Sequence, residues 1–326
     1  MDASLKNRIE GMILGQFLGD AAALGAHWIY NTTDLAQQFP GGIQGFESPA
    51  DGHYHAGKLS GDFTHYGDAS LVLLEALAEV DQFDARSYGK RFVESMDPKK
   101  GYAGYFDAAT RGTIENYKNA VAAGDADTYS FQEGADDDQL ATISSLAIFV
   151  GWFVAKNGLE TKTALLEQVE TLTRVRQNND RAVAYCQAHA LILFELLNGR
   201  DVHSAFHRAE SEMDAVGSFS VELLRKTKEA FDLKHKTVVD ATDELGQSCP
   251  LICSFPSSVQ ATAKHNEEFE SAILDIIRAG GDSAGRAAIV GSWIGARLGA
   301  SNLPQQWIAK MSAASRIKEL LAALLS

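Results

Sequence analysis

Cysteine, proline and positive charge are all scarce in this sequence. Only 3 of its 326 residues are cysteine and 6 are proline. The cysteines (Cys186, Cys249 and Cys253) form neither a disulfide framework nor a zinc-knuckle pattern, so nothing indicates an oxidising compartment. With so few prolines, and no Ser/Gly-rich run or block of like charge, no segment is typical of a linker. Length alone would suggest about two domains, but we expect a single domain over residues 1–326.

Basic residues are outnumbered, since 29 Lys and Arg stand against 43 Asp and Glu and give a formal net charge of −14. This balance argues against nucleic acid or an anionic membrane as a partner, because both are bound through basic patches. It leaves open a phosphorylated small molecule held by backbone amides. Long hydrophobic runs are also lacking, and the longest, Ser144–Ala155, is too short to span a bilayer. We expect a cytoplasmic protein.

The N-terminal segment begins like a signal peptide, with Lys6 and Arg8 before an apolar stretch. Polar residues interrupt that stretch, and its larger apolar residues fall on one face of a helix. These residues are Ile9, Met12, Ile13 and Phe17. The pattern predicts an amphipathic first helix rather than a leader.

Helical periodicity dominates the rest of the chain, and period-2 alternation is hard to find. Apolar residues recur at intervals of three and four in residues 71–78, 140–147 and 183–194. Two long segments lack the pattern, residues 31–66 and residues 245–258, and loops of that length are usually functional. The sequence therefore predicts an all-α fold of roughly a dozen helices, whose helix starts and two long loops converge on one cleft.

Carboxylates stand beside glycine or at the start of a helical stretch in four places. They are Gly19-Asp20, Gly67-Asp68, residues 136–138 and Gly281-Asp282. Each alone is more typical of an N-cap, whose side chain accepts hydrogen bonds from the first N–H groups of a helix. Four together favour a site, because carboxylates at converging helix ends serve divalent-metal and acid–base chemistry.

The histidines His53, His55 and His65, together with His27, raise the possibility of a zinc site. No two of them are spaced as ligands on one helical turn, and no Cys or Glu-x-x-His motif accompanies them. We therefore expect surface-loop histidines. Four aromatic residues in or beside the same loops either pack against a ring or sugar face or belong to the core: Trp28, Tyr30, Tyr54 and Tyr66.

Familiar catalytic motifs are absent. There is no Gly-x-Ser-x-Gly elbow, Gly-x-Gly-x-x-Gly turn or P-loop, so a serine nucleophile, dinucleotide redox chemistry and P-loop phosphoryl transfer are unsupported. Cys186 lies among apolar residues of a helical stretch and is expected in the core.

Three stretches resemble the ADP-ribosylglycohydrolase superfamily, and together they span nearly the whole chain. They read GMILGQFLGDAAALGA, FTHYGDASLVLLEAL and RAGGDSAGRAAIVGSWIGARLGASNLPQQW. Within that superfamily, DAAALGAHWIY and GGDSAGRA are more similar to the J1-crystallin-like branch. The resemblance implies an all-α fold and, in active members, a two-magnesium centre that hydrolyses an N- or O-glycosidic bond to ADP-ribose.

The metal-ligand motifs of that superfamily are incomplete here. Its Thr-Asp-Asp-Thr motif is matched to residues 66–69, where only Asp68 is acidic, and its Gly-Gly-Asp-Thr-Asp-Thr motif to residues 280–285, where only Asp282 is. A glutamate after the first Gly-Asp is also missing, because residues 27–30 hold no acid. Two Mg²⁺ ions need several hard oxygen ligands. We therefore expect at most one weakly bound Mg²⁺, with unknown ligands.

The sequence favours a hydrolase that cleaves a glycosidic bond in an ADP-ribosyl, ribosyl or related sugar conjugate without the dinuclear centre. Asp68 and Asp282, facing one another across the cleft, would activate water or stabilise an oxocarbenium-like transition state. Arg286, one turn after Asp282, either forms a salt bridge with it or binds an anion. The residues expected to hold the sugar or nucleotide sugar are His65, Tyr66, Trp28, Asp137, Asp138, Gln139, Ser283 and Arg286.

The alternative is a non-catalytic, J1-crystallin-like binding or structural protein that retains the fold. The retained polar clusters, Asp62 and residues 137–139, favour the enzyme. Unpaired carboxylates that face a cleft are costly to keep without a use.

Overall fold

The computed structural model describes residues 1–326, apart from the side chains of residues 214–216. It has sixteen α-helices, and no β-strand occurs in the described chain. Two isolated bridges pair Ala135 with Gln177 and Gln139 with Pro250. The all-α prediction is therefore confirmed, with more helices than expected.

The helices follow one another with short connections, except for residues 39–64 and 124–145. In chain order they are α1 (Ala3–Ala23), α2 (Thr32–Gln38), α3 (His65–Leu77), α4 (Ala85–Met96), α5 (Ala108–Ala123), α6 (Leu146–Asn157), α7 (Lys162–Arg176), α8 (Asp180–Leu197), α9 (Val202–Glu210), α10 (Ser220–Asp232), α11 (Val238–Leu245), α12 (Leu251–His265), α13 (Phe269–Arg278), α14 (Ser283–Leu298), α15 (Gln305–Ile308) and α16 (Ala314–Leu324).

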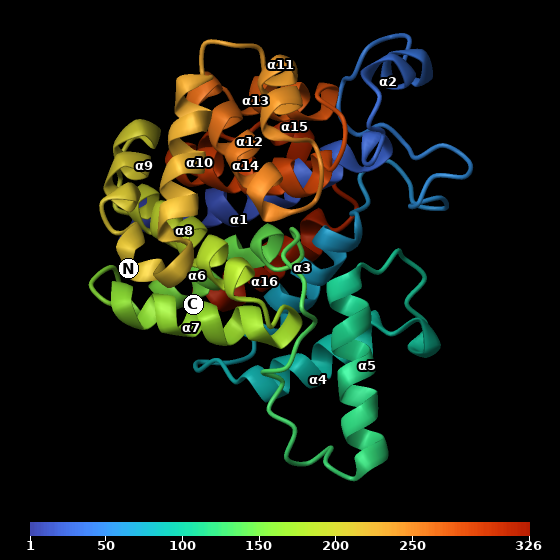
Figure 1. Ribbon diagram of the computed structural model, residues 1–326, viewed down its shortest axis with the longest axis vertical. Helices are drawn as coiled ribbons and strands as arrows, with labels where there is room; N and C mark the ends of the chain where they lie inside the picture. The colour runs from blue at the N-terminus through green and yellow to red at the C-terminus, as the bar shows by residue number, and fades with distance from the viewer.

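Helix α1 runs through the middle of the molecule beside α14 (Figure 1). The first helix is therefore confirmed, but its expected amphipathic character is wrong. Every residue from Gly11 to Ala23 except Leu14 is buried. A helix that is apolar on all faces belongs in the interior, and here the later helices of the chain cover the side that was expected to face water.

Glycines let α1 and α14 pack backbone against backbone. Gly15 faces Gly291 and Gly11 faces Gly295, and a Cβ on any of these four would overlap the carbonyl group opposite. The pairing is antiparallel, so the C-terminal end of α1 lies beside the N-terminal start of α14. The small residues after Asp282 thus serve close packing, which brings two helix ends to one place.

The two segments expected to be long loops contain helix. Helix α2 lies within residues 31–66, and α12 starts at Leu251, so only residues 246–250 separate it from α11. Pro256 lies inside α12, although proline costs a helix interior about 3 kcal/mol. Phe255 and Val259 on either side are fully buried, and this burial offsets the loss. As predicted, Cys186 is buried, within α8.

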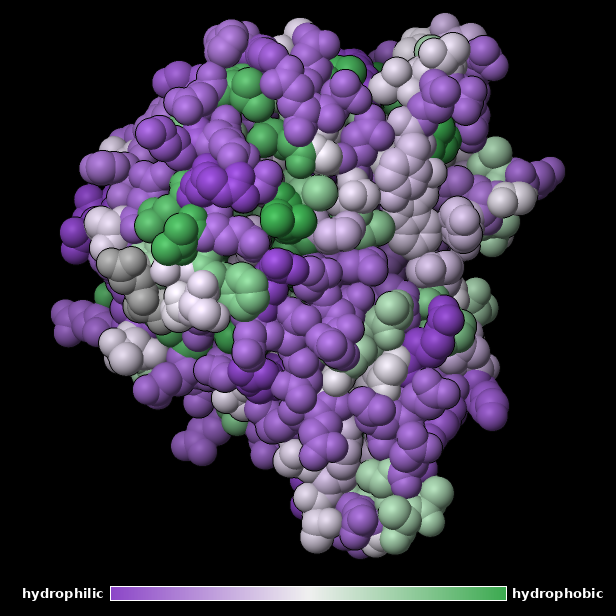
Figure 2. Space-filling model, in the orientation of Figure 1, coloured by the Kyte–Doolittle hydropathy of each residue, from purple (hydrophilic) through white to green (hydrophobic). Residues whose placement is uncertain are grey.

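Helices α4 and α5 extend below the other helices in Figure 1. The visible face in Figure 2 is mostly hydrophilic, with small scattered apolar groups. Among the helices of the described chain, none is both long and apolar enough to cross a membrane.

Candidate functional site

A cavity of about 400 Å³ lies at the starts of α3 and α5. Its aromatic wall consists of Trp28, Tyr30, Tyr54, Tyr66 and Tyr105. Its polar lining consists of Asp107, Arg111, Asp137, Gln139 and Cys249. These residues come from six separate parts of the sequence, which the fold brings together.

The aromatic side chains meet edge to face. Ring centroids are 5.1 Å apart between Trp28 and Tyr54, 4.7 Å between Trp28 and Tyr105, and 5.8 Å between Tyr54 and Tyr105. Tyr54 is 67% exposed, so it stands at the open side. Such a cluster offers flat apolar faces together with polar edges to a ring-shaped ligand.

Trp28 has a left-handed backbone conformation, with φ of +66°, which is a true outlier for so bulky a residue. Its N–H donates to the Gly281 carbonyl at 2.8 Å, and the Gly281 N–H donates to the Ile29 carbonyl at 2.9 Å. A Cβ on the neighbouring Gly280 would lie 2.7 Å from the Ile29 oxygen. This glycine pair thus allows a close approach of the two backbone segments, and the approach fixes Trp28 in the cavity wall.

Asp282 is fully buried and caps α14, since its Oδ1 accepts from the Gly285 N–H at 3.2 Å. Its Oδ2 accepts from the Tyr66 hydroxyl at 2.7 Å and from the Trp28 indole N–H at 3.3 Å. Burial raises the pKa of this carboxyl group, although hydrogen bonds from Cys249 and Tyr66 oppose the rise. Asp282 is therefore an N-cap that also anchors two side chains of the cavity wall from behind, and it does not itself line the cavity, where the sequence predicted a catalytic carboxylate.

Arg286 is buried and directs its guanidinium group at the turn before α14. It donates to the Asp282 main-chain carbonyl at 3.1 Å, to the Thr242 hydroxyl at 3.3 Å and to the Gly280 carbonyl. Burial lowers its pKa to about 10. The structure gives it neither the expected salt bridge to the Asp282 side chain nor a place in the cavity lining. Ser283 is also buried, and its hydroxyl has no hydrogen-bond partner among the described residues.

Asp68 is not brought to Asp282. Its Oδ2 accepts from the Lys58 ammonium group at 2.7 Å and from the Tyr102 hydroxyl at 2.8 Å, and these partners are outside the cavity lining. The reason is helical rotation. Asp68 follows Tyr66 by two residues, about 200° around α3, and Tyr66 is the residue that faces Asp282. The prediction that Asp68 and Asp282 face one another across the cleft is therefore wrong.

The acidic stretch before α6 divides between two environments. Asp137 turns to the cavity, and its Oδ2 accepts from the Gln177 amide at 2.9 Å. Burial raises the pKa of Asp137. Gln139 lines the cavity too, as expected for a substrate-binding residue. Asp138 instead pairs with Arg181 at 2.8 Å and does not contribute to the lining.

The sequence reading missed Asp107, the second carboxylate of the cavity. It caps α5, because its Oδ1 accepts from the Thr110 N–H at 2.7 Å. Its Oδ2 lies 3.5 Å from the Arg176 guanidinium group and 3.6 Å from Nε2 of His65. Burial alone would raise the pKa of Asp107, but Arg176, His65 and the cap bonds outweigh it and hold the pKa below its ordinary value. Its position before the Ala-Ala-Thr of a helical stretch was the available signal.

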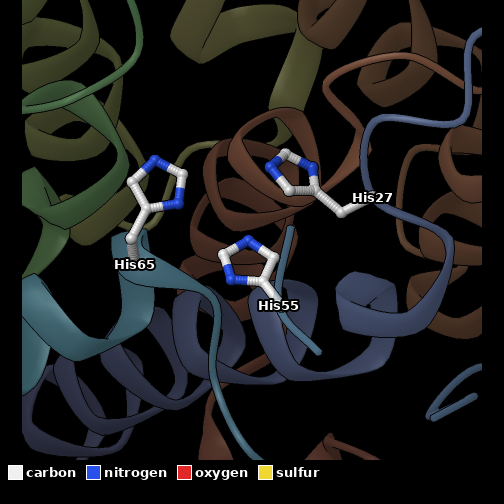
Figure 3. Close-up of side chains that lie close together, drawn as sticks. All are labelled: His27, His55 and His65. Carbon is white, nitrogen blue, oxygen red and sulfur yellow. The ribbon is translucent and has the colours of Figure 1, made fainter. Parts of the chain in front are cut away.

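His27, His55 and His65 point toward one another from three segments (Figure 3). They are 0%, 2% and 1% exposed, and one ring nitrogen from each lies within 4.8 Å of the others. Burial lowers the pKa of His55 to about 2 and that of His65 to about 4. The expectation of surface-loop histidines is wrong for these three, because the segment that carries His55 folds over the start of α3.

His53 supports this arrangement. Its Nε2 lies 2.6 Å from the His27 carbonyl oxygen, and its Nδ1 accepts from the His55 N–H at 3.0 Å. It therefore ties the loop to the segment after α1 and directs His55 inward.

Comparison with known proteins places these features in context. The family model described as ADP-ribosylglycohydrolase matches residues 1–326. Crystallin J1A and Crystallin J1B of Tripedalia cystophora are each 24% identical to the chain, over 318 and 310 residues, and the matches cover 96% and 94% of the chain and 94% and 92% of those proteins. The structure of an ADP-ribosylglycohydrolase-related protein complex matches with a TM-score of 0.66 at 18% identity, over 100% of this chain and 99% of that one. At that identity the structural likeness establishes the fold alone.

Proposed function

Since the chain belongs to the ADP-ribosylglycohydrolase family, we propose that it hydrolyses a glycosidic bond in an ADP-ribosyl, ribosyl or related sugar conjugate. The observation that carries the proposal is one cavity that combines an aromatic wall with two carboxylates, Asp107 and Asp137. Glycoside hydrolysis uses a pair of carboxyl groups, one that protonates the leaving group and one that assists water or stabilises the positive charge of the sugar.

Asp137 suits the role of the acid. Burial raises its pKa, so it keeps its proton to a higher pH than an ordinary aspartic acid and can give it to the leaving group. Asp107 suits the other role, because the neighbouring Arg176 favours its ionised form. Activity should decline as the pH rises through the raised pKa of Asp137.

Substrate recognition would use the remaining lining residues. Trp28 and Tyr105 offer ring faces to a base or a sugar, and Gln139 offers an amide that both donates and accepts. Arg111 lines the same cavity, and its guanidinium group is suited to a phosphate of a nucleotide sugar.

We propose further that the two-magnesium centre of active family members does not form here. The match of the Thr-Asp-Asp-Thr motif to residues 66–69 is replaced here by a match that begins at Thr64, because Thr64 caps α3. This match puts His65 and Tyr66 at the two aspartate positions and leaves Asp68 outside them. An imidazole and a phenol then replace carboxylates, whereas Mg²⁺ prefers oxygen ligands such as carboxylates. The retained carboxylate, Asp282, already accepts three hydrogen bonds. Calorimetric titration with MgCl₂ should reveal at most one weak site, and two micromolar sites would contradict this view.

The test is release of ADP-ribose from arginine-linked and serine-linked ADP-ribosyl peptides. Asp137→Asn should lower the rate by about a hundredfold or more, as expected for loss of a general acid. Asp107→Asn should do the same while the helix cap is kept, because asparagine caps as well as aspartate does.

Asp136 provides the matched control. It is the exposed neighbour of Asp137 and accepts from the Asn179 amide at 2.7 Å, so Asp136→Asn should leave the rate unchanged. If Asp137→Asn and Asp136→Asn were equally active, the assignment of Asp137 as the acid would be wrong.

The identity to the two J1 crystallins favours a second candidate, a protein that binds a ligand in this cavity without turnover. A thermal-shift titration with ADP-ribose separates the two candidates. Stabilisation by ADP-ribose with no release from either peptide would support the binding protein.

A further inference from the structure

Three buried imidazoles form a cluster directly behind the aromatic wall. The ring centroids of His27 and His55 are 5.6 Å apart, as are those of His55 and His65. Trp28 lies against all three rings, with centroid distances of 4.3 Å to His27, 5.3 Å to His65 and 5.7 Å to His55. The cluster is thus enclosed by protein on the side of the cavity.

Five of the six ring nitrogens of this cluster lack a hydrogen-bond partner in the described structure. Both nitrogens of His55, both of His65, and Nε2 of His27 are buried without a hydrogen-bond partner. A buried polar atom that lacks a partner destabilises the folded protein. Stacking of the rings does not remove that cost, because the ring nitrogens bond in the plane of the ring. In a neutral imidazole one ring nitrogen carries a proton and the other a lone pair, so each ring has one lone pair that a metal ion can bind.

We propose that His27, His55 and His65 bind a single Zn²⁺ ion through one ring nitrogen each. Neutral imidazole is the form that binds zinc, and burial keeps His55 and His65 neutral at physiological pH. The nitrogens, now within 4.8 Å of one another, need to close to about 3.3 Å, the spacing in a tetrahedron with Zn–N bonds of about 2.0 Å. The rings are now nearly parallel, with interplanar angles of 25° between His27 and His55 and 18° between His55 and His65, so binding requires the side chains to rotate until their ring nitrogens face one point.

Carboxylates stand behind two of the rings. Asp282 Oδ1 is 3.7 Å from Nδ1 of His27, and Asp107 Oδ2 is 3.6 Å from Nε2 of His65. A carboxylate behind a metal-bound histidine orients the ring and increases its basicity. In His27 the ring proton would then lie on Nδ1 and face Asp282, replacing the long 3.3 Å bond from the Ala284 N–H.

The donor set selects the class of metal. Three imidazoles suit zinc and its neighbours in the transition series, whereas Mg²⁺ and Ca²⁺ require oxygen ligands. Three protein ligands also leave one of the four tetrahedral positions for water or another small ligand. The proposed site is independent of the proposed hydrolysis, and its test measures metal rather than activity.

The experiment uses the full chain, stripped with a chelator, reloaded with ZnCl₂ and desalted before metal analysis. The parent protein should retain about one Zn²⁺ per chain. His55→Gln should weaken Zn²⁺ affinity by at least about 100-fold, since loss of a ligand costs more than loss of its support. Loading with Co²⁺ gives a check that needs no variant, because tetrahedral cobalt absorbs strongly in the visible range.

His189 is the matched control. It is fully buried, both of its ring nitrogens lack partners among the described residues, and burial lowers its pKa to about 3. Its ring packs on Trp293, outside the cluster. His189→Gln should therefore retain zinc as the parent does.

Two results would overturn the proposal. One is a parent protein that retains no zinc and gives no visible cobalt bands, in which case a buried water serves the three rings. The other is equal zinc retention by His55→Gln and the parent, which would place the bound metal on the protein surface.

Discussion

Replacing Asp282 with asparagine tests whether its carboxylate is more than a helix cap. The substitution changes one oxygen into an NH₂ group and alters almost nothing else. At an exposed N-cap the two residues are nearly equivalent, and their exchange changes stability by a few tenths of a kcal/mol. Asp282 differs because, besides the bond from Cys249, it accepts from three donors: the Gly285 N–H on Oδ1, and Tyr66 and Trp28 on Oδ2.

Neither orientation of the amide satisfies all three donors. With NH₂ in place of Oδ1, it faces the Gly285 N–H and the cap is lost. With NH₂ in place of Oδ2, it faces the Trp28 indole, which can only donate. One buried donor loses its acceptor in either case, at a cost of about 1–3 kcal/mol. The neutral amide also removes the cost of burying a charge, which the raised pKa of Asp282 reflects, so we expect a net loss of about 1 kcal/mol.

The measurement is the free energy of unfolding in urea, with Asp84→Asn as the control. Asp84 is an exposed N-cap of α4, and its Oδ1 accepts from the Ser87 N–H at 2.7 Å. The control should change by only a few tenths of a kcal/mol. If Asp282→Asn were as mild as Asp84→Asn, the bonds to Tyr66 and Trp28 would contribute nothing to stability, and the description of Asp282 as their anchor would fail.

Two further predictions concern packing and pH. Gly15→Ala should lower the free energy of unfolding by about 1–3 kcal/mol, because its Cβ would overlap the Gly291 carbonyl. Gly41→Ala, whose Cβ would have no described atom within 4 Å, should be neutral or slightly stabilising. Equal free energies of unfolding for the two variants would refute the close contact. Burial raises the pKa of Asp20 from 3.8 to about 7, although hydrogen bonds from Thr64 oppose the rise. The stability that protonated Asp20 contributes is therefore fully present below the unfolded pKa and is lost as the pH rises through the folded pKa. Between these two pKa values the stability of the parent protein should fall by about 1.4 kcal/mol per pH unit on account of Asp20. In urea unfolding at pH 5, 6 and 7, Asp20→Asn should show a weaker pH dependence than the parent. An equal pH dependence of the two proteins would contradict the raised pKa of Asp20.

Apolar spacing predicted where helices lie, including α8, which is buried from Ala182 to Leu197, but it did not show which helices are buried on every side. Helix α3 follows the expected spacing of leucines, and α8 follows that of residues 183–194. Helix α1 is buried on nearly every side from Gly11 onward, including its polar residues Gln16 and Asp20. Helices from distant parts of the chain cover these residues, and the spacing within α1 cannot show that cover. In α12, tertiary burial around Pro256 outweighs a local signal that normally ends a helix.

Single residues of the cavity lining could be predicted where their own chemistry, or their place in a loop, marks them. Trp28, Tyr66, Asp137 and Gln139 line the cavity, and each had been selected for its chemistry or its place in a loop. Asp68 was misplaced because a shift of two residues turns a side chain to the opposite face of a helix. Geometry of this kind depends on the exact helix start, which sequence patterns locate least well.

The histidine cluster and Asp107 depended on relations between distant segments. His27 follows α1, His55 lies in a loop and His65 opens α3, so no ligand spacing exists along the chain. Such a cluster becomes visible only once the loop is folded over the helix start. The same holds for Asp107, whose carboxylate acquires its character from Arg176, 69 residues away in the sequence.

The close packing of α1 on α14 is the step that makes the site possible. Burying Asp282 is tolerable only because Tyr66, Trp28 and Gly285 all donate to it, and Trp28 can do so only because its backbone is held to Gly281. That contact in turn depends on the end of α1 lying beside the start of α14. A wider separation of the two helices would remove the donors of Asp282 one after another and leave a buried charge without partners, which is far more costly than the lost packing. The glycines of the helix pair are therefore as important to the cavity as the residues that line it.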